Sequence, residues 1–133
     1  MGCVIDSRVL IQWEKGTIDL NEIVNQHKDE PFYLSVITAS ELLHGVPRAK
    51  SKAIRNRRSA FVEEVLRQFP ILEIDLNAAR SHAEIWADLI SKGQIIGGHD
   101  LWIAASCLAH GHSLITDNTK EFSRVEGLIV IPV

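Results

Sequence analysis

The sequence predicts an α/β fold in which a mostly parallel sheet is covered by helices on both faces. Short apolar segments rich in β-branched residues alternate along the chain with segments of helical periodicity. The chain has 133 residues, of which 46% are hydrophobic, so it can bury one core but leaves little room for a second. No repeat or flexible linker interrupts the pattern, and we expect a single domain over residues 1–133.

The predicted strands are short apolar runs, and the predicted helices have apolar residues three and four positions apart. The strands cover residues 3–5, 32–36, 71–74, 113–116 and 128–131. The helices cover about residues 9–13, 19–27, 38–46, 50–68, 77–92 and 101–109. Three of the predicted helices are expected to end at Gly16, Pro47 and Gly93, and Asp75 is expected to cap the helix that follows it. The last helix is almost entirely apolar, so we expect it to be buried.

Acidic and amide side chains follow the predicted strands or open the helices after them. Asp6 ends the first strand, Glu41 lies in the first turn after the second, and Asp100 opens the buried helix. Asp117 and Asn118 follow the strand 113–116. In parallel sheets, ligands bind at the carboxyl ends of the strands, where these residues are expected to meet. Neighbouring carboxylates repel one another, and their hard oxygen atoms suit Mg²⁺ or Mn²⁺.

Each acidic residue also has a local structural interpretation. Thr38 and Glu41 match a capping box, in which a glutamate bonds back to the start of its helix. Asp100 fits a helix cap or a partner of the helix dipole. Asp6 is harder to explain locally, because Ser7 is able to cap the next helix and burial of a carboxylate is costly.

The cysteines and histidines give no recognisable metal motif. Cys3 and Cys107 are far apart and outside any CxxC, which indicates a reducing cytosol and argues against disulfides or a zinc site. No histidines have paired-ligand spacing; His99 adjoins Asp100, and residues 110–112 are interpreted as a solvated turn. The N-terminus lacks the features of a signal peptide, and no apolar run is long enough to span a membrane. We therefore expect a cytoplasmic protein.

The charge distribution is uneven. Seventeen acids against fourteen bases give a net charge of −3, which by itself disfavours nucleic acid as a partner. Residues 48–58, however, carry six basic residues and no acid: Arg48, Lys50, Lys52, Arg55, Arg57 and Arg58. This basic segment is either a solvated helix face or a surface for a phosphate backbone.

Four sequence motifs together resemble the VapC-type toxins among the PIN-domain ribonucleases. They are VIDS at residues 4–7, LSVITASELLHGV at 34–46, IGGHDLWIAA at 96–105, and LIT at 114–116 followed by Asn118 and Phe122. The motifs come in the family's order and spacing and span the chain. The resemblance implies a three-layer α/β/α PIN-like domain.

The resemblance also implies a function and a site. Asp6, Glu41 and Asp100 fall on the family's acidic positions for Mg²⁺ or Mn²⁺, and Asn118 falls on the fourth, with Asp117 one residue early. The implied activity is endoribonuclease cleavage of RNA phosphodiester bonds, with the basic segment holding the RNA. The implied partners are a second copy of the chain, as a homodimer, and a small VapB-type antitoxin.

One residue departs from the family pattern and keeps two alternatives open. Arg8 stands where the family usually has a small polar residue, and it is placed either to grip the scissile phosphate or to crowd the metal. The first alternative is a haloacid-dehalogenase-type phosphatase with Asp6 as nucleophile, although that chemistry normally needs an aspartate where Arg8 stands. The second is a non-catalytic PIN-like binding module.

Overall fold

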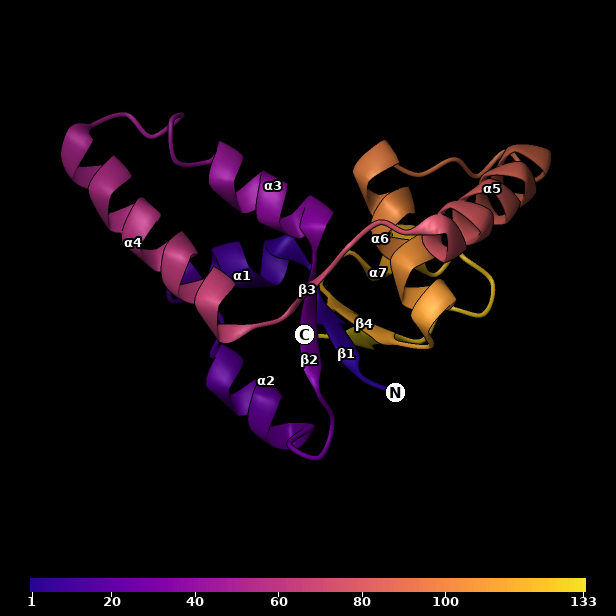
Figure 1. The fold of residues 1–133 in the computed structure, drawn as a ribbon, viewed down its shortest axis with the longest axis horizontal. Helices are drawn as coiled ribbons and strands as arrows, with labels where there is room; N and C mark the ends of the chain where they lie inside the picture. Colours follow the sequence, from indigo (N-terminus) through magenta and orange to yellow (C-terminus); the bar gives the residue numbers. More distant parts are fainter.

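The computed structural model describes residues 1–133 and contains a five-stranded sheet in which every pair of neighbouring strands is parallel (Figure 1). The strand order is β3-β2-β1-β4-β5. The strands are β1 (Cys3–Ile5), β2 (Phe32–Ser35), β3 (Ile71–Leu72), β4 (Ser113–Thr116) and β5 (Val130–Pro132). The predicted α/β class is confirmed, and the sheet is wholly rather than mostly parallel.

Seven helices cover the two faces of the sheet. They are α1 (Ser7–Glu14), α2 (Leu20–Gln26), α3 (Val36–His44), α4 (Lys52–Gln68), α5 (Leu76–Ser91), α6 (Gly98–His110) and α7 (Thr119–Phe122). Figure 1 shows α1 to α4 on one side of the sheet and α5 and α6 on the other. None of these helices is both long and apolar enough to cross a membrane.

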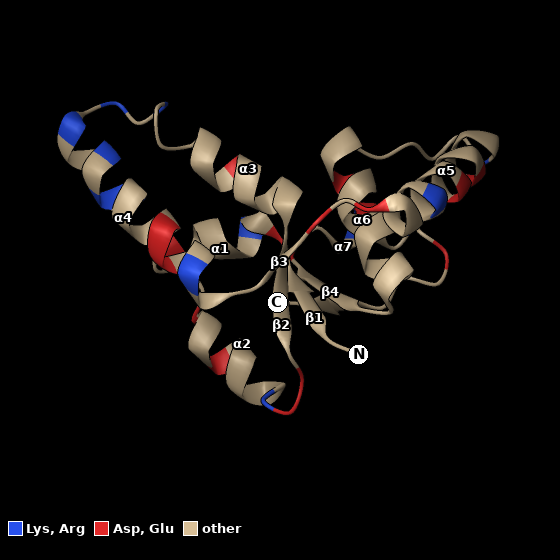
Figure 2. Cartoon of the chain, in the orientation of Figure 1, with Lys and Arg blue, Asp and Glu red and all other residues tan.

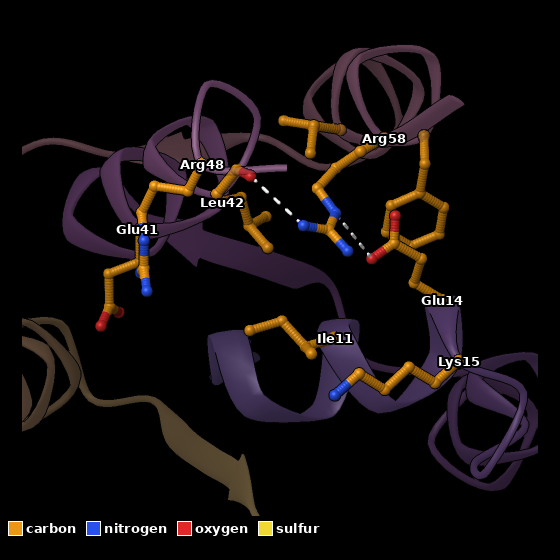
Figure 3. A pocket seen from close by; sticks show the side chains of 10 residues that line it. Ile11, Glu14, Lys15, Glu41, Leu42, Arg48 and Arg58 are labelled. Carbon is orange, nitrogen blue, oxygen red and sulfur yellow. Dashed lines mark hydrogen bonds and ion pairs between the residues drawn. The ribbon is translucent and has the colours of Figure 1, made fainter. Parts of the chain in front are cut away.

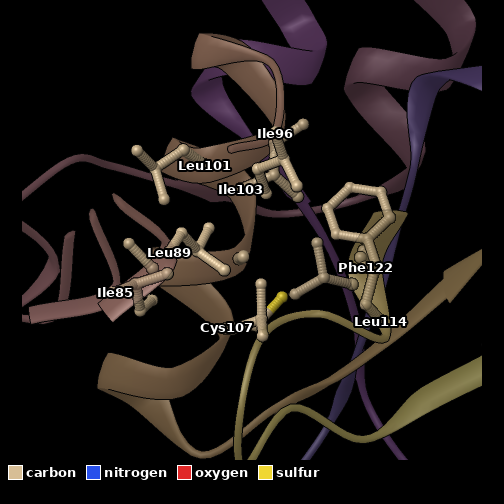
Figure 4. Packing of buried hydrophobic residues seen from close by; sticks show 12 residues of the cluster. Ile85, Leu89, Ile96, Leu101, Ile103, Cys107, Leu114 and Phe122 are labelled. Atoms are coloured by element: carbon tan, nitrogen blue, oxygen red, sulfur yellow. The ribbon is translucent and has the colours of Figure 1, made fainter. Parts of the chain in front are cut away.

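The side chains of the central strand β1 contribute to two hydrophobic cores, one on each face of the sheet. Val4 packs in the cluster formed mainly by α5 and α6, whereas Cys3 and Ile5 pack in the cluster beneath α1, α2 and α4. Figure 4 shows the first cluster, in which Leu89 of α5 and Phe122 of α7 are buried. Alternate residues of a strand face opposite sides of the sheet, so a fully apolar strand requires cover on both faces.

Several element boundaries differ from the sequence prediction, and for α3 the reason is helix capping. Ser35 accepts a hydrogen bond from the Ile37 backbone N–H, so α3 begins at Val36 and not at Thr38. Helix α6 begins at Gly98, three residues before the predicted start. Strand β3 is only two residues long, and the short helix α7 was not predicted. The predicted cap at Asp75 is confirmed, since its carboxylate accepts from the Ala78 N–H.

Candidate active site

Asp6 lies at the carboxyl end of β1, at the centre of the sheet. Its backbone N–H donates to the Ile115 carbonyl at 2.9 Å, so the sheet still fixes the residue after the strand has ended. The side chain is fully buried; Oδ2 accepts from the Thr116 hydroxyl at 2.7 Å, and Oδ1 has no hydrogen-bond partner. Asp6 occupies the N-cap position of α1, but its carboxylate does not cap the helix. The prediction that Ser7 caps α1 is wrong, because Ser7 is already the first helical residue.

Asp100 approaches Asp6 from the first turn of α6. It is only 5% exposed. Gly97 holds the N-cap position of α6, so the interpretation of Asp100 as a helix cap is wrong. Asp100 lies in the first turn, where its negative charge interacts favourably with the helix dipole. The guanidinium of Arg8 donates to Asp100 Oδ1 at 3.2 Å and Oδ2 at 3.1 Å, and also to Asp6 Oδ2 at 2.9 Å. One cationic group therefore joins two carboxylates that are 94 positions apart in the sequence.

The electrostatics of this cluster are those of two acids sharing one base. Burial raises the pKa of Asp100 above its ordinary value, and the charges of Asp6 and Glu121 act in the same direction, while Arg8 opposes them. Burial disfavours the charge of Arg8, but its hydrogen bonds to Asp100 and the charge of Asp6 raise its pKa overall. The site thus favours a cation between Asp6 and Asp100, and in this structure the cation is Arg8.

Glu41 lies beside this pair, held by contacts from two other elements. Its Oε1 accepts from the Ser7 hydroxyl at 3.1 Å, and its Oε2 lies 3.5 Å from Nδ1 of His99. The capping-box interpretation is wrong, since the helix starts two residues before Thr38 and Glu41 is well inside it. The ligand oxygens of the three acids do not all lie within 4.8 Å of one another. Glu41 therefore flanks the Asp6–Asp100 pair.

Three residues after β4 are candidates for the fourth position of the predicted metal site: Asp117, Asn118 and Glu121. Asp117 is exposed and accepts a hydrogen bond from the Gln12 side chain, so it turns toward α1. The Asn118 backbone N–H donates to the Thr116 hydroxyl at 3.0 Å, which fixes the turn after β4. Glu121 is half-buried on α7 and near enough to Asp100 to raise its pKa.

Sequence reasoning missed Glu121 because the four-residue helix that carries it has no clear periodicity. It also assigned no role to the hydroxyl of Thr116, although Thr116 belongs to the LIT motif. A polar residue at the end of a buried strand was the available signal for Thr116.

In the basic segment 48–58, some side chains form hydrogen bonds or ion pairs within the fold and others form none. Arg55 donates to the Ala49 carbonyl at 3.1 Å, and Arg58 donates to the Gly45 carbonyl at 3.3 Å and pairs with Glu14 at 3.5 Å. Four bases are exposed and form neither an ion pair nor a side-chain hydrogen bond: Arg48, Lys50, Lys52 and Arg57. Figure 2 shows basic residues gathered along the first half of α4 and the loop before it.

A pocket lies between the basic segment and Glu41, at the edge of the acidic site that Asp6, Glu41 and Asp100 form. It has a volume of about 290 Å³ and lies between α1, α3 and α4, with Glu41, Arg48 and Arg58 among its lining residues (Figure 3). Apolar side chains of Leu42, Phe61 and others complete its wall. The pocket therefore places positive charge next to the acid that flanks the Asp6–Asp100 pair.

This arrangement of acids at the carboxyl edge of a parallel sheet coincides with a family match. Residues 3–128 match the PIN domain. The chain belongs to the PIN-domain family. Within this family it is a VapC-type ribonuclease toxin of the VapBC toxin–antitoxin kind, as its relatives show. This assignment overturns the alternative of a haloacid-dehalogenase-type phosphatase.

The similarity to VapC proteins covers the whole PIN-domain chain. Ribonuclease VapC1 of Rickettsia felis is 37% identical over 133 residues, which are 100% of this chain and 97% of the relative. The VapBC2 structure from Rickettsia felis, bound to a promoter DNA fragment, superposes with a TM-score of 0.90 at 25% identity and covers 100% of this chain and 99% of that one. The DNA-bound VapBC of Salmonella typhimurium gives 0.88 at 28% identity, covering 99% and 98%.

Proposed function

We propose that this VapC-type ribonuclease hydrolyses RNA phosphodiester bonds with Mg²⁺ or Mn²⁺ held by Asp6 and Asp100. The observation that carries the proposal is the convergence of these two buried carboxylates on one cationic group. Two acids in that position repel each other unless a cation stands between them. A divalent ion fulfils this need more completely than the single charge of Arg8.

The donor atoms fit a hard divalent ion. Asp6 Oδ1 is a buried carboxylate oxygen without any hydrogen-bond partner, an arrangement that is costly unless something else contacts the atom. Its other oxygen is fixed by Thr116, which leaves Oδ1 as the free ligand. Asp6, Asp100, Glu41 and Glu121 offer only oxygen, the donor that Mg²⁺ and Mn²⁺ prefer.

The residues around the pair would divide the hydrolytic work. When bound, the metal supplies charge neutralisation on the attacked phosphate. Glu41, with one oxygen held by Ser7 and the other facing His99, is placed to orient the attacking water and accept its proton. Thr116 keeps the Asp6 carboxylate in one rotamer, which preserves the geometry of the pair.

Arg8 would leave the carboxylates when the divalent ion enters. Its side chain is 40% exposed, so the guanidinium has solvent-accessible space to move into. Once released, it is near the place where a scissile phosphate would lie, and a guanidinium binds phosphate with two parallel hydrogen bonds. Arg8 thus serves as a competitor of the metal in the free protein and as a phosphate ligand in the substrate complex.

The RNA backbone would run from this site over the basic segment. Arg48 lines the pocket beside Glu41, and the free bases Lys50, Lys52 and Arg57 extend the positive surface. Arg55 and Arg58 hold the protein backbone of this segment in place through hydrogen bonds to backbone carbonyl groups. Binding there releases counterions from the RNA and depends on salt.

The proposed partners follow the relatives named above. The structures from Rickettsia felis and Salmonella typhimurium are VapBC complexes, and we extend a small VapB-type antitoxin to this chain. The proposed cytoplasmic location rests on the sequence alone, through its unpaired cysteines. Leu76, Trp86 and Ile90 are large apolar residues exposed on α5, the kind of surface that a second copy in a homodimer or an antitoxin would cover.

The test compares Asp100→Asn with Asp88→Asn, a surface acid paired with Lys92 on α5. With Mn²⁺ and a mixture of transfer, ribosomal and messenger RNA, Asp100→Asn should lower the cleavage rate at least about 100-fold. Asp88→Asn should cleave at the wild-type rate, and circular dichroism should show that both variants fold. Cleavage by Asp100→Asn at the rate of Asp88→Asn would refute the assignment.

The VapC-type assignment also overturns the alternative of a non-catalytic binding module, because the relatives are ribonucleases. The Arg8 bridge already neutralises the acids, so metal binding is measured separately from cleavage. Calorimetry should detect Mn²⁺ binding by the wild type, and Asp6→Asn should abolish it. A wild type that binds no Mn²⁺ would contradict the proposed metal site.

A further inference from the structure

A second cluster of potential metal ligands lies at the opposite end of β1 from the acidic site. It consists of Cys3, His27 and Glu30, whose sulfur, nitrogen and oxygen ligand atoms all lie within 4.8 Å of one another. It is the one group of three cysteine, histidine or acidic side chains in the chain that meets this distance. The spacing of the cysteines gave no sign of it, because Cys3 is 24 positions from His27.

Each ligand comes from a backbone position that the fold fixes. Cys3 opens β1, and its N–H donates to the Pro31 carbonyl at 2.9 Å. His27 directly follows α2 as its C-cap residue, and the Glu30 N–H donates to the His27 carbonyl at 3.0 Å. The three side chains are therefore brought together by hydrogen-bonded turns and strands, which lowers the entropic cost of gathering them around an ion.

The distances are close to those of a small tetrahedral centre. Cys3 Sγ lies 2.9 Å from Glu30 Oε2, and His27 Nδ1 lies 3.7 Å from the same oxygen. Zinc bonds of about 2.3 Å to sulfur and about 2.0–2.2 Å to nitrogen and oxygen place tetrahedral ligand atoms roughly 3.3–3.6 Å apart. Changes of up to about 1 Å in the distances between ligand atoms, within reach of small side-chain rotations, would match that geometry.

The charges of the cluster also call for a cation. Glu30 is half-buried, and its ion-pair partner within 4.0 Å is His27 rather than a lysine or arginine. The Cys3 thiol donates a hydrogen bond to Glu30 Oε2 at 2.9 Å, so without an ion the sulfur carries a proton. A divalent ion would replace that proton, and thiolate plus carboxylate would balance its charge.

We propose that Cys3, His27 and Glu30 bind one Zn²⁺ ion, with water as the fourth ligand, and that this ion fastens the α2–β2 turn to β1. On binding, the Cys3 S–H bond loses its proton to solvent and a sulfur–metal bond forms. Thiolate and imidazole are ligands typical of zinc and poor ligands for Mg²⁺, so this site and the acidic site would select different ions. The role is structural, because the turn lies at the amino end of β1 (Figure 1), whereas Asp6 follows the carboxyl end of that strand.

The experiment is a Co²⁺ titration of the full chain, with Mg²⁺ in excess to fill the acidic site and a phosphine reductant that keeps thiols free. Wild-type protein should gain one equivalent of a sulfur-to-cobalt charge-transfer band. Cys3→Ser should lose it, and Cys107→Ala should keep it, because Cys107 is buried in the other core. Asp100→Asn should also keep it, which separates this site from the proposed catalytic one.

A second measurement covers the case in which Cys3→Ser fails to fold. Zn²⁺ should raise the melting temperature of the wild type, and His27→Gln should reduce the apparent Zn²⁺ affinity tenfold or more. The control Asn25→Ala, in the last turn of α2, should not reduce it. No charge-transfer band in the wild type, or a band that survives in Cys3→Ser, would overturn the proposal. Equal zinc stabilisation of the wild type and His27→Gln would do the same.

Discussion

The two ends of strand β1 carry polar clusters of opposite character. At the carboxyl end, Asp6 and Asp100 provide only oxygen atoms, and Arg8 already lies between them as a cation. At the amino end, Cys3, His27 and Glu30 provide sulfur, nitrogen and oxygen, and they have no arginine or lysine among them. Cys3 opens β1 and Asp6 directly follows it, so the two residues are only three positions apart, yet their surroundings differ in chemistry.

The difference shows that the surroundings of a buried polar group decide its role. Asp6 has one oxygen tied to Thr116 and one without a partner, which leaves a free ligand in a closed site. Cys3 has its single donor satisfied by Glu30, so the group is stable as it stands and changes only when an ion displaces its proton. We therefore propose a catalytic role for the carboxyl end of β1 and a structural role for its amino end.

The largest expected effect contrasts the two ends directly. Asp6→Asn should reduce RNA cleavage with Mn²⁺ by at least about 100-fold, equivalent to ~2.7 kcal/mol of transition-state stabilisation. Cys3→Ala should leave the cleavage rate within about twofold, because it changes only the amino end. Initial rates at saturating Mn²⁺ check both. Similar losses in both variants would mean that the two ends do not act separately.

The next effect concerns the cation already present at the carboxyl end. Arg8→Asn should tighten Mn²⁺ binding about tenfold, or ~1.4 kcal/mol, because the ion no longer competes with a guanidinium for Asp6 and Asp100. Calorimetric titration measures the affinity. Arg57→Asn, which removes a base that forms no ion pair, is the control and should bind Mn²⁺ as the wild type does. Weaker Mn²⁺ binding by Arg8→Asn would contradict the competition.

A smaller effect is expected for the basic segment that serves the carboxyl end. Lys52→Glu combined with Arg57→Glu should raise the KM for RNA several-fold at low salt while kcat stays the same. Removing two phosphate contacts should reduce the salt dependence of binding by about 1.4 in the log–log slope. Binding measured at several salt concentrations checks this. A loss of kcat without a change in KM would assign these residues to catalysis instead.

The smallest expected effect is a change of the melting temperature with pH, which arises at the amino end of β1. Burial, together with His110 and the N-terminal amine, lowers the pKa of His112, whose Nδ1 accepts from the Gly2 N–H at 2.9 Å. A histidine whose pKa is lowered by folding stabilises the fold above its unfolded value of about 6.5, and this stability is lost as the pH falls through the folded pKa. The melting temperature should therefore drop between about pH 7.5 and about pH 5.5.

His112→Gln should show a smaller drop than the wild type over the same range. His82, whose pKa is also lowered by burial, provides the comparison, because it lies on α5 against Trp102 and away from β1. If His82→Gln removes the whole acid response and His112→Gln none, the amino end of β1 does not titrate as described.

The sequence by itself determined the alternation of strands and helices and the acids at the strand ends. Periodicity of two and of 3.6 residues is local, so β1 and the helices were recognisable from short segments. The match of four motifs pointed to the PIN family, and Asp6 stood out because a carboxylate directly after a buried strand has no local purpose. Boundaries were less certain, since the cap at Ser35 competes with an equally good pattern at Thr38.

Only the tertiary structure decided which polar groups meet. Arg8 looked like a simple departure from a pattern until the fold placed its guanidinium between Asp6 and Asp100. Cys3 looked isolated until the parallel pairing of β1 and β2 brought it to Glu30. The physical reason is that hydrogen bonds and metal coordination act over a few ångströms in space, whereas sequence patterns report only neighbours along the chain.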